Sequence, residues 1–214
     1  MRILDLTHTI TESMSVYPGT EPPVLSVPCT IALDGYTETL LHLYSHTGTH
    51  MDAPAHMIAG GLTLERFPPE QFVGSAFVID CSALGAGACI DLSLIEKELE
   101  AAKRADFLLF RTGWDKKWGT NAYFGDFPCI SSALADFIVS TGKKGIGLDV
   151  ISVDPINSKT MENHMRILSG GKTVIIENLR DLEKVGKKPF TLVAAPLKFE
   201  SSDGAPTRVL ALMD

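Results

Sequence analysis

The first third of the chain alternates between strand-like segments and turn residues. Alternating apolar and polar positions, typical of strands, cover residues 2–10, 24–33 and 36–46. The YPGTEPP segment at 17–23 is predicted to be a turn, because its prolines lack the N–H group that regular structure uses. Pro28 places the second strand at a sheet edge or at a bulge. The third strand is expected to deliver His46 at its end and to break at Gly48.

The remainder of the chain alternates between segments with helical spacing and short buried strands. Helices are predicted over 91–104, 131–142 and 160–171, and strands over 106–114, 144–150, 172–178, 190–199 and 207–213. This order indicates parallel strands joined by helical crossovers. Because no linker separates this part from the first third, we predict one α/β domain with a mixed sheet over residues 1–214.

Several of the predicted strands end in polar residues. Arg111 and Thr112, Asp149, and Glu177 follow three of the buried segments. Ligands of open α/β sheets bind beyond the carboxyl ends of the strands. We therefore expect these side chains to lie at one edge of the sheet, where a site would form.

Composition and charge narrow the range of partners. Of the 214 residues, 45% are hydrophobic and 21% are charged, and the net charge is −7. An acidic chain does not suit nucleic acid or an anionic membrane surface. No apolar run reaches the roughly 18 residues of a membrane span, and the N-terminus lacks the apolar stretch of a signal peptide. The four cysteines form no C-x-x-C pair, so we expect reduced core thiols and a cytoplasmic protein.

Histidines are concentrated in one short stretch of the chain. Four of the six lie between residues 42 and 56, namely His42, His46, His50 and His56. His46, His50 and Asp52 are close enough in sequence to offer imidazole and carboxylate ligands to one metal ion. Gly48 lets the backbone turn so that both rings can face inward. The carboxylate of Asp52 has two oxygens and can bridge two ions.

Distant residues are needed to complete such a site. His164 lies on a predicted helix that precedes the strand ending in Glu177, so both can reach the same edge of the sheet. His8 has no ligand-like neighbour, and we interpret it as structural. His164 and Glu177 raise the number of candidate ligands from three to five. Five ligands exceed the four of a structural zinc site and fit two ions bridged by carboxylate. Nitrogen and oxygen ligands favour zinc, with manganese or iron as alternatives. His56 is then left as a general acid/base.

The sequence resembles the cyclase-like metal-dependent hydrolase family, which includes bacterial kynurenine formamidases and isatin hydrolases. The resemblance rests on HTGTHMDAPAH at 46–56. It continues along the whole chain, in order, through DLTHTI, YPG, FRTGW, GLDVISVDP, NHMRIL with IIENL, and DGAPTRVLAL. It implies a swivelling β/β/α fold and a homodimer or higher homo-oligomer.

The resemblance also implies a role for each candidate ligand. By analogy with the formamidases, one metal ion would be bound by His46, His50 and Asp52. A second would be bound by Asp52, His164 and Glu177, and Glu177 would also be able to bridge. Some relatives work with a single manganese ion held by the first three groups, so the resemblance implies either one ion or two.

An amide hydrolase is the function that the resemblance implies. His56 matches the family's catalytic histidine, and relatives cleave small amides, including cyclic ones and N-formyl aromatic amines. In such a reaction metal-bound hydroxide attacks the carbonyl and His56 passes a proton to the leaving nitrogen. The alternatives are a lactone or cyclic-imide hydrolase, a cyclase acting on another carbonyl, and a metal-binding protein without turnover.

Four further features allow two interpretations each. Tyr17 stands where formamidases often carry a tryptophan, and it either lines the substrate pocket or packs as a turn residue. Arg111 either binds a substrate carboxylate or forms a buried structural ion pair. Ser152 and Asp154 either orient the substrate or cap the following turn. The aromatic segment 114–128 is a loop over the pocket or at a subunit interface.

Overall fold

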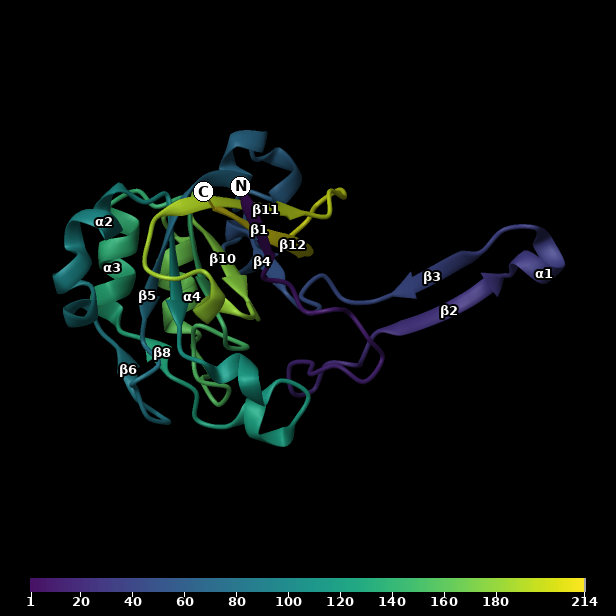
Figure 1. The fold of residues 1–214 in the computed structure, drawn as a ribbon, viewed down its shortest axis with the longest axis horizontal. Helices are drawn as coiled ribbons and strands as arrows, with labels where there is room; N and C mark the ends of the chain where they lie inside the picture. Colours follow the sequence, from purple (N-terminus) through teal and green to yellow (C-terminus); the bar gives the residue numbers. More distant parts are fainter. Residues whose placement is uncertain (214) are drawn as a thin grey trace.

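Eight strands form one mixed sheet in the computed structural model, which describes residues 1–213 (Figure 1). In sheet order they are β1 (Arg2–Asp5), β12 (Gly204–Met213), β11 (Phe190–Pro196), β5 (Val73–Asp80), β7 (Phe107–Arg111), β9 (Gly145–Leu148), β10 (Val174–Glu177) and β4 (His50–Asp52). β4 also pairs with β12, so the strands from β12 to β4 close into a ring and β1 lies outside it.

Parallel and antiparallel pairs share this sheet. β5, β7, β9 and β10 run parallel to one another, and the other neighbours in the ring pair antiparallel. The predicted α/β fold with a mixed sheet is therefore confirmed. β1 pairs antiparallel with the end of β12, which brings the two ends of the chain close together (Figure 1).

Side-chain alternation along the ring strands divides the core into two clusters. Phe77 and Ile79 of β5 belong to the cluster that packs against the helices. Ala76 and Val78 belong to the second cluster, which fills the interior of the ring. Two other parallel strands of the ring, β7 and β10, alternate in the same way. Because successive side chains of a strand point to opposite faces, strands buried on both faces must be apolar at every position.

Three short helices cover the outer face of the parallel strands. They are α2 (Leu99–Arg104), α3 (Ser132–Ser140) and α4 (Glu162–Leu168). α3 begins where the sequence predicts, because the Ser131 side chain accepts a hydrogen bond from the Leu134 N–H at 3.1 Å. The helix predicted over 91–104 is too long. Two 3₁₀ turns precede α2, and the backbone at Glu98 leaves the helical region with φ −126° and ψ 19°.

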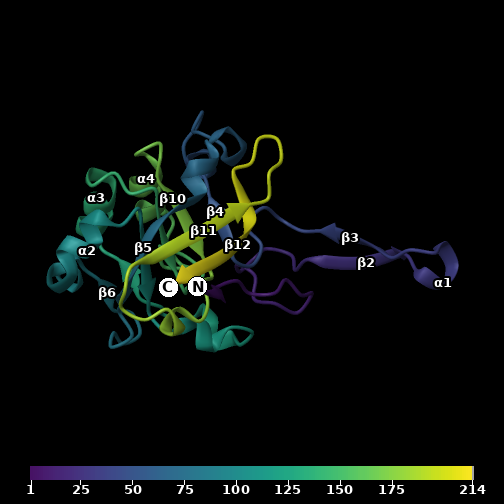
Figure 2. The ribbon, with the colours of Figure 1, turned by 45° about the horizontal axis from the view of Figure 1, so that its top comes forward.

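Two small sheets lie apart from the main one. A parallel pair joins β6 (Cys89–Ile90) to β8 (Cys129–Ile130). The antiparallel pair β2 (Val24–Cys29) and β3 (Glu38–His42), joined through α1 (Ile31–Asp34), projects far from the body of the molecule (Figures 1 and 2). We refer to residues 24–42 as the arm.

Two of the predicted N-terminal strands differ from the structure of the arm. The segment predicted as one strand over 24–33 ends at Cys29 and continues as α1. The strand over 36–46 stops at His42, so His46 lies in the following turn rather than at a strand end. The chain reverses there, and Gly48 has a φ of +67°, which agrees with the predicted break. In the described part of the chain, no helix is long and apolar enough to cross a membrane.

Candidate metal centre

β4 carries two of the predicted ligands on one face. His50 and Asp52 are two residues apart, so both side chains leave the same side of the strand, while Met51 points into the core. β4 lies between β10 and β12, and its register places Glu177 opposite His50 and Gly204 opposite Asp52. Strand pairing thus brings Glu177 beside a histidine that is distant in sequence.

His164 reaches the same point from α4. The Asp154 carboxylate accepts hydrogen bonds from the His164 N–H at 3.0 Å and from the Asn163 N–H at 2.9 Å, so it caps the start of the helix. It also accepts a hydrogen bond from His164 Nδ1 at 2.7 Å. Asp154 therefore caps α4 rather than the turn that follows it, and the Ser152 hydroxyl accepts a hydrogen bond from the Asp154 N–H at 3.1 Å. The bond at Nδ1 also fixes the ring so that Nε2 faces the site.

The ring nitrogens and carboxylates meet at the spacing of metal ligands. His50 Nε2 is 3.3 Å from Asp52 Oδ1 and 3.5 Å from Glu177 Oε2. His164 Nε2 is 3.6 Å from Asp52 Oδ2 and 3.3 Å from Glu177 Oε1. Ligands arranged tetrahedrally about 2.1 Å from a zinc ion are roughly 3.4 Å apart. His50 Nδ1 donates to the Gly48 carbonyl at 2.9 Å, so its Nε2 is left for an ion.

The electrostatics of the cluster require positive charge. Asp52 and Glu177 are 1% and 4% exposed, and Asp52 Oδ2 has no hydrogen-bond partner among the described residues. Burial alone would raise the pKa of Asp52, but the imidazoles of His164, His46 and His50 hold it well below its usual value. Buried carboxylates are stable only when they are paired or bind a cation. The residues present therefore fit a divalent metal ion.

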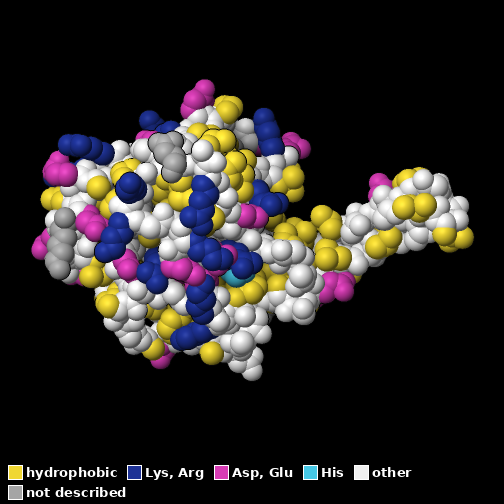
Figure 3. Space-filling model, in the orientation of Figure 1, with side chains coloured by type: hydrophobic (Ala, Val, Ile, Leu, Met, Phe, Trp, Pro, Cys, Tyr) yellow, Lys and Arg dark blue, Asp and Glu magenta, His cyan; other side chains and the backbone are white. Residues whose placement is uncertain are grey.

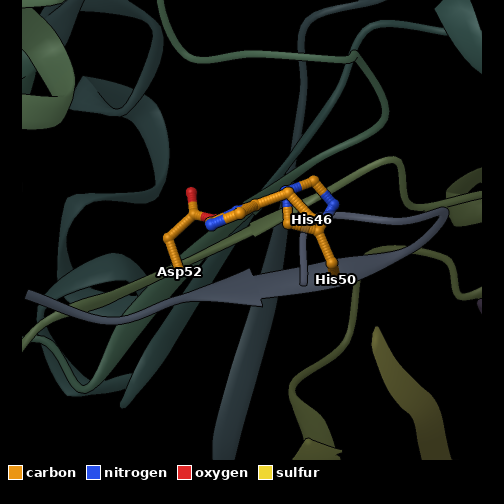
Figure 4. A group of neighbouring side chains, drawn as sticks. All are labelled: His46, His50 and Asp52. Carbon is orange, nitrogen blue, oxygen red and sulfur yellow. The ribbon is translucent and has the colours of Figure 1, made fainter. Parts of the chain in front are cut away.

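Two overlapping triads of ligands share Asp52. His46, His50 and Asp52 form one, and Asp52, His164 and Glu177 form the other; within each, the ligand atoms lie within 4.8 Å of one another. Figure 4 shows the side chains of the first triad converging beside β4. The structure thus brings together all five residues that the sequence predicts as ligands. An ion held by three protein ligands would keep a coordination position open, as catalytic sites do.

Asp203 is a member of this site that the sequence pattern does not reveal. Its Oδ2 is 3.0 Å from His46 Nε2 and 3.7 Å from His56 Nδ1. Although burial lowers the pKa of His46, Asp203 and Asp52 together raise it to about 10. Asp203 lies far from the histidine stretch, and its position just before Gly204 in DGAPTRV is the only signal in the sequence.

His56 lies beside the two triads and belongs to neither. It ends a 3₁₀ turn over Pro54–His56, its ring centre is 4.0 Å from that of His46, and burial lowers its pKa. It is close to Asp203 and His46, which makes a third group of metal-ligand type. That group is more exposed, with the Asp203 side chain 44% exposed. His56 therefore lies next to the candidate ligands, and its imidazole is not required to complete either triad.

A cavity of about 440 Å³ opens over the cluster. Tyr17 lines it, as predicted for a pocket residue, and its hydroxyl also donates to the Ile156 carbonyl at 3.2 Å. Val16, Ile151 and Met161 add apolar surface. Among the described residues that line the cavity, none is Lys or Arg.

Three other predicted features lie away from this cavity. Arg111 does not line it, and its guanidinium pairs with Asp80 at 2.9 Å. The ion-pair interpretation of Arg111 is thus favoured over substrate binding, although the pair is half-exposed rather than buried. The segment 114–128 places Trp114 and Tyr123 in the core and does not border the cavity. His8 stacks on Trp118 with ring centres 4.1 Å apart, which suits a structural role.

Of the polar strand ends, only Glu177 belongs to the centre. The Asp149 carboxylate accepts hydrogen bonds from the Thr112 N–H at 2.8 Å, from its hydroxyl at 2.6 Å and from the Gly113 N–H at 2.7 Å. Asp149 therefore holds the turn that follows β7. The strand ends do lie at one edge of the sheet, as expected, because β7, β9 and β10 run parallel. Arg111, Thr112 and Asp149 nevertheless do not border the cavity.

Comparison with known proteins finds similarity to one family model and to several hydrolases. The family model named Cyclase matches residues 4–155. A kynurenine formamidase from Bacillus cytotoxicus is 30% identical over 97% of this chain and 95% of its own length. Isatin hydrolase A from Ralstonia solanacearum is 25% identical with a TM-score of 0.86, covering 100% of this chain and 92% of that one. A protein from Bacillus stearothermophilus described as a predicted metal-dependent hydrolase is 29% identical, with a TM-score of 0.77 and coverage of 98% and 97%.

Replacing Gly204 by alanine tests how the first triad is held. A Cβ at this position would stand 2.8 Å from His46 Nε2 and 2.9 Å from His46 Nδ1, so the His46 ring must shift from its present position in the triad. We expect zinc affinity in calorimetric titration to fall roughly 10- to 100-fold, the usual effect of disturbing ligand orientation. Gly85→Ala is the matched control, because a Cβ there meets open space. Equal zinc affinity in the two variants would contradict the expectation.

Proposed function

The chain belongs to the cyclase-like family of metal-dependent hydrolases, and we propose that it cleaves the C–N bond of a small amide. The observation that carries this proposal is the convergence of four ligand groups, His50, Asp52, His164 and Glu177, at 3.3–3.6 Å. The described residues that line the cavity above them include no Lys or Arg. The formamidase and isatin hydrolase relatives support the reaction class.

One or two divalent ions would be held by the two triads. In the first, His46, His50 and Asp52 are the ligands; in the second, Asp52, His164 and Glu177. Divalent ions in such sites supply Lewis acidity and a nucleophile at neutral pH. Zinc is the ion we propose, because nitrogen and oxygen ligands in groups of three with an open position are typical of catalytic zinc; manganese is the alternative.

His56 is the group we propose for proton transfer. Its ring lies 4.0 Å from that of His46 and 5.9 Å from that of His164, at the wall of the cavity. An imidazole at this distance can take a proton from the attacking water and pass it to the departing nitrogen. Asp203, whose Oδ2 is 3.7 Å from His56 Nδ1, would orient the ring. A protein that only stored metal would have no use for this arrangement.

The cavity favours a compact and uncharged substrate. Its volume of about 440 Å³ lies in the range of small-molecule sites, and Val16, Ile151 and Met161 give it apolar walls. Apart from the metal ions and their histidine ligands, a substrate carboxylate would find no Lys or Arg among the described lining residues. A cyclic amide of the isatin type, or an N-formyl aromatic amine without a carboxylate, therefore fits better than an amino acid.

The reducing compartment expected from the cysteines is also part of this proposal. Cys29, Cys81, Cys89 and Cys129 are all free thiols. Free thiols fit the cytoplasm, where disulfides are rare.

Metal removal should abolish hydrolysis and lower stability. We expect the chelated protein to be inactive and zinc or manganese to restore activity on isatin or on a neutral N-formyl aromatic amine. N-formylkynurenine, dihydropyrimidine-type cyclic amides and lactones complete the panel. An ion present at 100 times its dissociation constant would add about 2.7 kcal/mol to the free energy of unfolding. If added metal gave neither turnover of any substrate nor a higher melting temperature, the proposed function would be wrong.

Replacing His56 by alanine separates proton transfer from metal binding. We expect kcat to fall by about 100-fold or more, while the zinc content of the purified variant equals that of the unmodified protein. Full activity in His56→Ala would exclude the proposed proton transfer. Loss of zinc together with activity would instead place His56 among the ligands, with His46 and Asp203.

A further inference from the structure

A buried hydrogen bond connects the aromatic segment 114–128 to the metal centre. Tyr123 of this segment is fully buried, and its hydroxyl donates to Asn178 Oδ1 at 2.7 Å. Asn178 follows the candidate ligand Glu177 at the end of β10 and is 3% exposed. Charged side chains are scattered over the surface of the body of the molecule (Figure 3), whereas this contact is uncharged and lies inside it. Losing either partner would leave a buried polar group unpaired, which is costly.

Packing within the segment holds Tyr123 in place. Trp114 Nε1 donates to the Tyr123 carbonyl at 2.9 Å. The Trp118 ring meets the Tyr123 ring edge-on, with ring centres 5.1 Å apart, and also stacks on His8. Tyr123 is not among the described residues that line the cavity. It can therefore act on the site only through its contacts in the core.

Every polar group of Asn178 has a hydrogen-bond partner. Its N–H donates to the Val150 carbonyl at 2.9 Å, and its carbonyl accepts from the Thr49 hydroxyl at 2.6 Å. Its side chain accepts from Tyr123 and donates through Nδ2 to the Gly48 carbonyl at 2.8 Å. Its φ of +57° lies in the left-handed region, which asparagine tolerates better than most residues do. Asn178 thus joins the end of β10 to the turn that precedes β4.

The Gly48 carbonyl accepts two hydrogen bonds, one of them from a candidate metal ligand. His50 Nδ1 donates to it at 2.9 Å and Asn178 Nδ2 at 2.8 Å, and a carbonyl oxygen has lone pairs for both. Because Gly48 lacks a Cβ, its own backbone preferences do not hold this carbonyl in one direction. The amide of Asn178 supplies that constraint. The Nε2 atom of His50 is thereby kept facing the carboxylates of Asp52 and Glu177.

The direction of the amide is set in turn by Tyr123. The Gly48 carbonyl can only accept, so Nδ2 of Asn178 must face it, and Oδ1 is left for the tyrosine hydroxyl. Without the hydroxyl, Oδ1 would lose its donor and the amide one of its two fixed contacts. We propose that Tyr123 and Asn178 are positioning residues, which hold the His50 ring in the orientation that binds metal. This inference rests on the proposed metal-dependent function and extends it to the segment 114–128.

Replacing Tyr123 by phenylalanine removes the hydroxyl and keeps the ring in the core. We expect zinc affinity, measured by calorimetric titration of the folded protein, to fall about 10-fold, the lower end of the usual effect of disturbing groups that orient a ligand. Asn178→Gly removes both side-chain bonds, and glycine adopts the positive φ without strain. This variant should lose zinc affinity by at least the same factor.

A double variant shows whether Tyr123 acts through Asn178. When Tyr123→Phe is combined with Asn178→Gly, the missing hydroxyl has no amide left to hold. The zinc affinity of the double variant should therefore equal that of Asn178→Gly alone, because residues that act as one unit give non-additive losses. Two losses that simply multiply would mean that the residues act independently, and would overturn the proposal.

The matched control is Thr173→Val, which removes another buried hydroxyl. That hydroxyl donates to the Lys143 carbonyl at 3.0 Å, beside the end of β10 opposite to Glu177. The control should lower the melting temperature of the metal-free protein, as Tyr123→Phe does, but bind zinc like the unmodified protein. An equal loss of zinc affinity in Thr173→Val would show that affinity follows general stability, and would contradict the proposal.

Two outcomes separate this inference from the proposed function. If the unmodified protein binds zinc and Tyr123→Phe binds it equally well, the positioning role is wrong and the proposed function stands. If the unmodified protein binds no zinc, both are wrong.

Discussion

Two carboxylates buried against each other are the constraint around which this protein is built. Asp52 and Glu177 lie on neighbouring strands, nearly without solvent, and no described Lys or Arg lines the cavity above them. The surrounding structure supplies what such a pair needs. The antiparallel pairing of β4 with β10 and β12 closes the ring of strands at the point where the ligands meet. Hydrogen bonds at Nδ1 of His50 and His164 leave both Nε2 atoms facing the carboxylates. The strand pairing that closes the ring therefore also positions the candidate ligands.

The candidate ligands could be recognised in the sequence because their signals are local and chemical. His46, His50 and Asp52 lie within one short stretch of backbone, which turns at Gly48, so their sequence spacing alone indicates that they can meet. His164 and Glu177 could be added because a helix and the strand after it return to the same edge of a parallel sheet. Asp203 could not be found this way, since only the pairing of β12 with β4 brings it beside His46 and His56.

The errors have a common physical origin, because local pattern does not report what covers a segment. Residues 36–46 alternate as a half-buried strand would, yet β3 is exposed throughout and ends at His42. Arg111 ends a buried strand, a position where catalytic residues are often found. Its guanidinium instead forms an ion pair with Asp80 on the adjacent strand. In residues 91–104 the helical spacing is present, but the segment bends into 3₁₀ turns around the fully buried Ile95. Tertiary packing decides each of these cases.

The most direct test of a metal-centred site is anomalous diffraction from crystals grown with zinc. One or two strong peaks are expected at the zinc edge, one bounded by His46, His50 and Asp52 and the other by Asp52, His164 and Glu177. His56 would lie beside these peaks without contacting them. The contrary result would be an absence of anomalous density at this position, with the same imidazoles bonded directly to the carboxylates. That outcome would make the cluster a buried ion-pair network and remove the basis for metal-dependent hydrolysis.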